Sequence, residues 1–181
     1  MFDPPSVSAR APRAGGVVAG VLAIALAACV SAPLADRLQP NPGESLAVVM
    51  SADGVQIYEC RARKGAGHEW VFVAPEADLF DRRGRKVGRH GAGPYWQADD
   101  GSRLVATLLQ RVDAREPGAI PWLSMSARAD GGSGVLSDVT SIQRLHTHGG
   151  VAPDAGCHRG AVGSTTRVRY LAEYHFFKAR Y

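Results

Sequence analysis

The stretch TRVRYLAEYHFFKARY, residues 166–181, alternates between apolar and polar side chains. Every second residue from Val168 to Phe176 is apolar or aromatic, whereas Arg169, Glu173 and His175 occupy intervening positions. Because successive side chains of a β-strand point to opposite faces, this period of two predicts a strand with one face in a core and the other in solvent. A single strand cannot form a core alone, so its partners must come from the rest of the chain.

Further short apolar runs lie upstream of this strand, and turn residues separate them. The runs are LAVVM (46–50), VQIYECRA (55–62), EWVFVA (69–74), PYWQA (94–98), SRLVATLL (102–109), IPWLSMSARA (120–129) and VTSIQRLHT (139–147). Asp53-Gly54 and Asp100-Gly101 each stand between two runs, a pattern that favours a hairpin, and Arg83-Gly84 marks another. With about eight or nine short strands and no long amphipathic helix, the sequence predicts a single all-β domain, a sandwich or barrel, over residues 45–181.

The first residues of the chain have the features of an export signal. GGVVAGVLAIALAA (15–28) carries no charge, follows Arg10 and Arg13, and is too short to span a bilayer comfortably. It runs into LAAC (26–29), which resembles the lipobox of bacterial lipoproteins. We therefore predict a lipoprotein signal peptide over residues 1–28, a lipid on Cys29, and a proline-rich tether over residues 29–44; the alternative is a short hydrophobic segment with an incidental cysteine.

The residue after Cys29 and the net charge bear on location and partners. In bacteria with two membranes, Asp at that position retains lipoproteins at the inner membrane, so Val30 predicts the outer membrane, with the domain facing the periplasm. The chain has 21 Lys and Arg against 17 Asp and Glu, and loss of residues 1–28 removes two Arg and one Asp, which leaves a net charge of +3. This mild charge and the export signal predict a membrane partner through the lipid anchor and no nucleic-acid partner.

Two cysteines remain once Cys29 is lipidated. Export would place Cys60 and Cys157 in an oxidising compartment, where an even number of cysteines predicts a disulfide. The alternative is two buried free thiols.

Candidate ligand-binding residues cluster in RHGAGPYWQADDGS (89–102), with one more from IPWLSMSA (120–127). Glycines let a backbone approach a ligand closely, and a neighbouring aromatic ring can form a stacking wall. The alternative is a glycine turn leading into a hairpin whose tryptophan belongs to the core. The candidates are His90, Gly93, Trp96, Asp100, Ser102 and Trp122.

The segment LHTHGGVAPDAGCH (145–158) contains three histidines and one cysteine. His146 and His148 have the H-x-H spacing seen where strands supply zinc or copper ligands. A third ligand would have to come from His158, His175 or a carboxylate, and no H-E-x-x-H or C-x-x-C accompanies the pair. We therefore predict no metal and no other cofactor, with His146 and His148 as the alternative metal site.

Several blocks in one order resemble a known family. They are GVQIYECRA, the segment from Trp70 to His90, AGPYWQADDGS, IPWLSMSA, IQRLHTHGGVAP with Cys157, and YLAEYHFF. The chain thereby resembles domain-of-unknown-function family 3455, secreted or lipid-anchored proteins of bacteria and fungi. The resemblance implies that Cys60 and Cys157 form a disulfide, and it does not require His146 or His148.

From these observations we predict a non-catalytic module of the cell envelope that binds a small molecule, a glycan or a protein. The alternative is a secreted enzyme. It would be either a hydrolase using His90 with Asp99 or Asp100, or a metal-dependent oxidoreductase using His146 and His148.

Overall fold

The computed structural model describes residues 38–180. The predicted signal peptide, Cys29 and most of the predicted tether lie outside the described residues. Within residues 38–180, no helix has the length and apolar character needed to cross a membrane.

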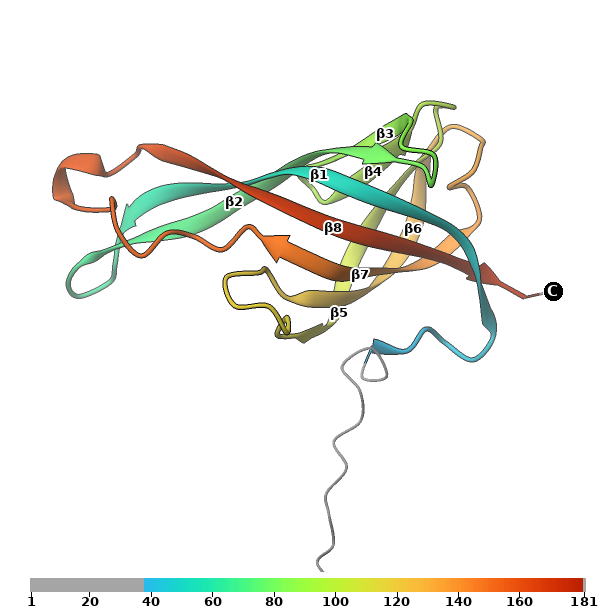
Figure 1. Cartoon of the computed structure of the whole chain (residues 1–181), viewed down its shortest axis with the longest axis horizontal. Helices are drawn as coiled ribbons and strands as arrows, with labels where there is room; N and C mark the ends of the chain where they lie inside the picture. The colour runs from blue at the N-terminus through green and yellow to red at the C-terminus, as the bar shows by residue number, and fades with distance from the viewer. Residues whose placement is uncertain (1–37, 181) are drawn as a thin grey trace, which may run out of the picture. The chain divides into compact units, whose positions relative to one another are not determined.

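Eight antiparallel strands form a closed barrel, in which each strand pairs with the next and the last pairs with the first (Figure 1). The strands are β1 (Glu44–Ala62), β2 (His68–Phe80), β3 (Lys86–Gly91), β4 (Tyr95–Ala98), β5 (Arg103–Val112), β6 (Trp122–Gly131), β7 (Val139–Gly149) and β8 (Thr165–Ala179). A single turn of 3₁₀ helix, Arg159–Ala161, precedes β8. The prediction of a single all-β domain is confirmed, and the architecture is the barrel.

The alternating pattern of residues 166–181 places one face of β8 inside the barrel. Tyr170, Tyr174 and Phe176 are at most 1% exposed and belong to the main core cluster, together with Met50 and Leu79 from β1 and β2. The charged side chains of the other face point outward; the Arg169 guanidinium, for example, pairs with the Asp53 carboxylate at 2.7 Å. The strand and its two faces are therefore as the sequence predicts.

One predicted turn is wrong. Asp53-Gly54 does not form a hairpin, because β1 continues through it as one strand that pairs with β2 on one side and β8 on the other. Gly54 serves close packing instead, since a Cβ at this position would lie 2.2 Å from the Glu76 carbonyl oxygen and 2.4 Å from the Ala77 Cβ. The turns at Arg83-Gly84 and Asp100-Gly101 are confirmed, and both glycines have a positive φ.

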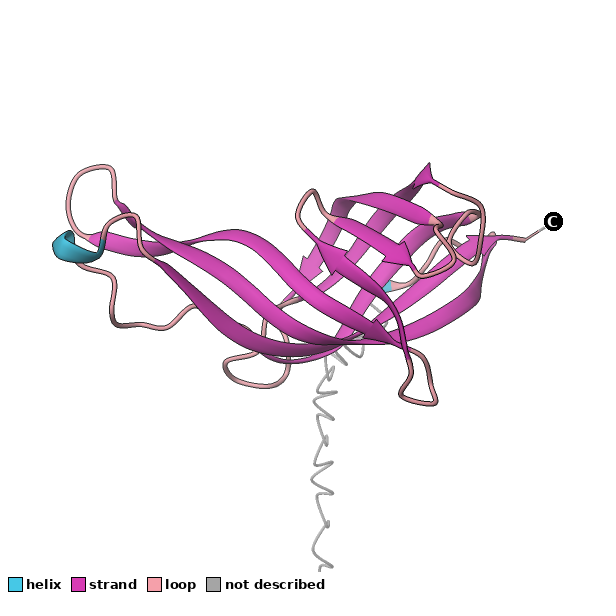
Figure 2. Ribbon diagram, turned by 90° about the horizontal axis from the view of Figure 1, so that it is seen from above, coloured by secondary structure: helices cyan, strands magenta, loops and turns pink. Residues whose placement is uncertain are grey.

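The long strands β1, β2 and β8 continue past the barrel as a twisted three-stranded arm (Figure 2). Near the tip of this arm Cys60 and Cys157 form the predicted disulfide, with an S–S distance of 2.01 Å. The connection between β7 and β8 is held against the arm at two further points. The Tyr58 hydroxyl donates to the Gly150 carbonyl at 2.6 Å, and the Trp70 indole N–H donates to the Ala155 carbonyl at 2.9 Å.

Candidate functional site

The barrel encloses a cavity of about 320 Å³ where the arm begins. Strand β3 pairs with β2 only over Ala77–Phe80, so the earlier part of β2 has no neighbour on that side and the wall is open there. Phe72 and Val73 lie at this opening and are 50% and 47% exposed. Every strand contributes to the lining, in order through Gln56, Phe72, His90, Trp96, Leu108, Met125, Arg144 and Tyr174.

His90 lines this cavity, borders the larger hollow described below, and is 4% exposed. It faces Trp96 across the β3–β4 pair, and the two rings stack with centroids 4.2 Å apart. Its Nδ1 lies 2.7 Å from the Tyr95 carbonyl oxygen. A carbonyl can only accept, so Nδ1 carries the proton and Nε2 is left as an acceptor. Burial lowers the pKa of His90 to about 3, although the hydrogen bond to Tyr95 partly opposes this effect, so the ring is neutral at pH 7.

Two buried donors in the cavity wall have no hydrogen-bond partner within residues 38–180. They are Gln56 Nε2 and Trp96 Nε1, on side chains that are 3% and 1% exposed. An unpaired buried donor costs about 1–3 kcal/mol, and because these two atoms have almost no accessible surface, a molecule in the cavity accepts from them only if the side chain turns toward it. The lining as a whole is mostly apolar with a few polar side chains, which is the general form of a ligand site.

The guanidinium of Arg144 also borders the cavity, and two hydrogen bonds to the backbone fix its orientation. Its Nε and Nη2 both donate to the Pro121 carbonyl oxygen, at 3.1 and 2.8 Å. No acidic residue lines the cavity, and none of the ion pairs among the described residues involves Arg144. The cavity consequently carries a net positive charge.

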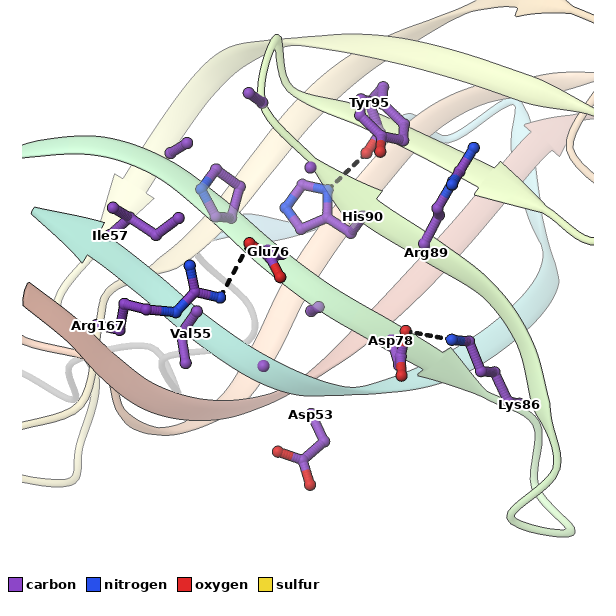
Figure 3. Close-up of a pocket in the computed structure, with 16 residues that line it drawn as sticks. Asp53, Val55, Ile57, Glu76, Asp78, Lys86, Arg89, His90, Tyr95 and Arg167 are labelled. Atoms are coloured by element: carbon purple, nitrogen blue, oxygen red, sulfur yellow. Dashed lines mark hydrogen bonds and ion pairs between the residues drawn. The ribbon is translucent and has the colours of Figure 1, made fainter.

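A larger hollow of about 700 Å³ lies along the outer side of β1 and β2 (Figure 3). Four of its charged side chains pair with one another, Arg167 with Glu76 at 2.9 Å and Lys86 with Asp78 at 2.6 Å. These pairs are about half exposed, and exposed ion pairs contribute little free energy. Of the other two charged side chains, Asp53 pairs with Arg169, and Arg89 hydrogen-bonds Gln97. The smaller interior cavity is the better candidate because its lining is mostly apolar and its one cation, Arg144, takes part in none of the ion pairs among the described residues.

Asp100 and Ser102 do not line the interior cavity but hold a loop. The Asp100 carboxylate accepts hydrogen bonds from the Ser102 hydroxyl at 2.6 Å and from the Val135 N–H at 2.7 Å. The bond from Ser102, then those from the backbone, lower the pKa of Asp100. Neither Asp99, which is exposed, nor Asp100 is among the contacts of His90, so the structure does not bring the predicted hydrolase residues together.

Trp122 also lies away from the cavity, although it is only 7% exposed. It packs against Leu38 and Leu145 in a second, smaller cluster. The cavity is lined instead by the alternate residues of β6, Leu123 and Met125.

Among the predicted ligand residues, the structure brings together His90, Gly93 and Trp96. Sequence reasoning missed Gln56 and Arg144 as site residues. The available signal was a polar side chain at an inward position of an alternating strand, since each lies two residues from a buried apolar side chain, Tyr58 or Ile142.

His146 and His148 lie at an irregularity where the pairing of β7 with β8 shifts register. His146 has a φ of 49°, and its ring contacts Trp122, while His148 Nδ1 pairs with the Glu116 carboxylate. Within residues 38–180, no three His, Cys, Asp or Glu side chains are placed to hold a metal ion.

Comparison with known proteins gives a family and no activity. No curated protein and no solved structure matches the chain. A family described as proteins of unknown function, DUF3455, matches residues 40–178, nearly the whole of the barrel. The chain therefore belongs to the DUF3455 family of proteins of unknown function.

Proposed function

We propose that the barrel is a binding module that holds one small, mainly apolar molecule in its interior cavity. The observation that carries this proposal is the cavity itself, to which all eight strands contribute and whose mostly apolar lining includes one cation, Arg144. The open wall beside Phe72 and Val73 supplies an entrance. Barrels of eight strands are just wide enough to hold one small ligand in this way.

The chemistry of His90 favours binding over acid–base catalysis. A general base works best when its pKa lies near the working pH, whereas the pKa of His90 is lowered to about 3 by burial. Its Nδ1 is moreover engaged with the backbone of its own hairpin at Tyr95. The ring thus serves as a neutral wall of the cavity, stacked between Trp96 and the edge of Tyr174.

The chain provides its own reporters for a test of this proposal. It contains three tryptophans, and of these only Trp96 lines the cavity. In the isotope-labelled full chain, titration with the neutral probe 1-octanol should shift the indole N–H resonance of Trp96, and leave those of Trp70 and Trp122 in place. Ala106→Phe should weaken this binding at least tenfold, because the added ring occupies the cavity, which Ala106 lines.

Ala66→Phe is the matched control, since Ala66 is exposed in the turn between β1 and β2. It should bind 1-octanol as the wild type does. If the Trp96 resonance moves neither with 1-octanol nor with octanoate, the carboxylate with the same number of carbons, the cavity is not a binding site. If Ala106→Phe and Ala66→Phe weaken octanol binding equally, the binding site lies outside the cavity.

We also infer that the module is held at the bacterial cell envelope by a lipid on Cys29, with residues 1–28 removed as a signal peptide. The lipobox-like LAAC sequence supports this, and the Cys60–Cys157 disulfide is compatible with export to an oxidising compartment. The outer membrane, as Val30 suggests, remains part of this proposal.

Cys29→Ala should leave an unprocessed precursor without acyl groups, as measured by intact mass of the membrane fraction. Ser31→Ala is the control and should be processed normally. Normal processing of Cys29→Ala would refute the lipoprotein assignment.

A further inference from the structure

The polar side chains in the lining of the interior cavity are predominantly donors. Arg144 brings a guanidinium, while the Gln56 Nε2 and Trp96 Nε1 donors have no partner within residues 38–180 and almost no accessible surface. No aspartate or glutamate lines the cavity to balance the positive charge of Arg144. A guanidinium in an apolar cavity without a carboxylate beside it is the recognition chemistry of an oxyanion, above all of a carboxylate or phosphate that can accept in two directions.

The guanidinium is also preorganised. Because Nε and Nη2 both donate to the Pro121 carbonyl oxygen, the plane of the Arg144 group is fixed before any ligand arrives. Little further side-chain entropy is lost when the remaining N–H groups bind an anion, which favours affinity. The positive charge of Arg144 is also felt by Tyr174, since it partly offsets the burial that raises the pKa of that phenol.

The rest of the lining is apolar and leads toward the opening. Leu123 and Met125 lie within the barrel, while Phe72, Val73 and Leu108 are about half exposed at the mouth. The volume of about 320 Å³ corresponds to roughly ten water-sized groups, at about 30 Å³ each. A molecule that matches both the Arg144 guanidinium and this apolar lining has an anionic head and a short hydrocarbon chain.

We infer that the ligand of this cavity is an amphiphilic carboxylate of about ten non-hydrogen atoms, with its carboxylate on Arg144 and its hydrocarbon chain directed to the mouth at Phe72. This inference rests on the proposed binding function and adds the chemical class of the ligand. Carboxylate is preferred to phosphate because one guanidinium supplies a single positive charge, which matches a monoanion.

The test compares octanoate with 1-octanol on the full chain, with the Trp96 indole N–H resonance as the readout. The two probes share a hydrocarbon chain and differ in charge at one end. Octanoate should bind at least tenfold more tightly. Arg144→Met should remove this preference, so that octanoate binds no more tightly than octanol, while octanol binding stays within about twofold of the wild type, since Met keeps most of the apolar volume of the side chain.

Arg128→Met is the matched control, because Arg128 is an exposed arginine on β6 with a side chain 74% exposed. It should keep the full preference for octanoate. Arg144→Lys is a second variant for the case in which Arg144→Met fails to fold. Lysine keeps the positive charge but lacks the planar guanidinium with its paired N–H donors, so this variant should bind octanoate with intermediate affinity.

The outcomes separate the two proposals. Octanol and octanoate binding with equal affinity, or an equal loss of both in Arg144→Met, would overturn the carboxylate assignment and leave the binding module intact. Tighter binding of octyl phosphate than of octanoate would replace the carboxylate by a phosphate head group. Failure of every probe to shift Trp96 would remove the binding function itself.

Discussion

Replacement of Cys60 and Cys157 by serine should lower the free energy of unfolding by about 3–5 kcal/mol. The bridge joins residues that are 97 positions apart, so it removes the entropy of a long loop from the unfolded chain. In the native state it also fixes the β7–β8 connection to the arm, where Cys60 has no exposed surface.

Urea unfolding of the double variant Cys60→Ser/Cys157→Ser, followed by circular dichroism, measures this loss as a lower midpoint. The wild type with its disulfide reduced should unfold at nearly the same denaturant concentration, which separates loss of the bridge from the effect of two serines. A change below 1 kcal/mol in both samples would show that the arm and its loop are held by other contacts.

Acidification from pH 7 to pH 4 should destabilise the barrel by about 3 kcal/mol through His90 alone. Burial lowers the pKa of His90 to about 3 in the folded state, whereas an unfolded histidine titrates near 6.5. Above pH 6.5 neither state is protonated and the stability is fully present. Between these two values the unfolded chain binds one more proton than the folded chain, so stability falls by up to about 1.4 kcal/mol per pH unit as the pH is lowered.

His90→Gln removes this titration and should flatten the dependence of unfolding free energy on pH between pH 6.5 and 4.5, where most carboxylates remain ionised. The comparison uses slopes, because the substitution also changes the stability at pH 7. His68→Gln, at a partly exposed position of β2, is the control and should keep the wild-type slope. Parallel slopes for wild type and His90→Gln would contradict the low pKa.

The parts of the fold that were predicted correctly are those that depend on neighbouring residues. The alternation in β8 assigns Tyr170, Tyr174 and Phe176 to the core without reference to any other strand. The turn at Asp100-Gly101 follows from local backbone preferences. Asp53-Gly54 has the same two residues and a different role, because its glycine is required by the approach of β2, a contact that no local pattern contains.

The cavity could not be predicted because it is assembled from one to three residues of each of eight strands. Whether a residue lines the cavity depends on the register of each strand pair, which for example places His90 opposite Trp96. It also depends on which face of each strand is covered by other parts of the chain. Trp122 illustrates this second point. At Trp122 the strand is covered on both faces, since Leu38 packs on the outer one, so a large aromatic residue there indicates burial but not whether it points into the barrel.

The pairing of β1 with β8 has a consequence for how the chain acquires its structure. The two strands align from Glu44 opposite Ala179 to Glu59 opposite Thr165, so the seam that closes the barrel joins segments from opposite ends of the domain. Seven of the eight strand pairs can form between neighbours in sequence, but the eighth has to wait until β8 is available. We therefore expect closure to be the slow, late step of folding, with β1 and β8 exposed as unpaired edges until it occurs.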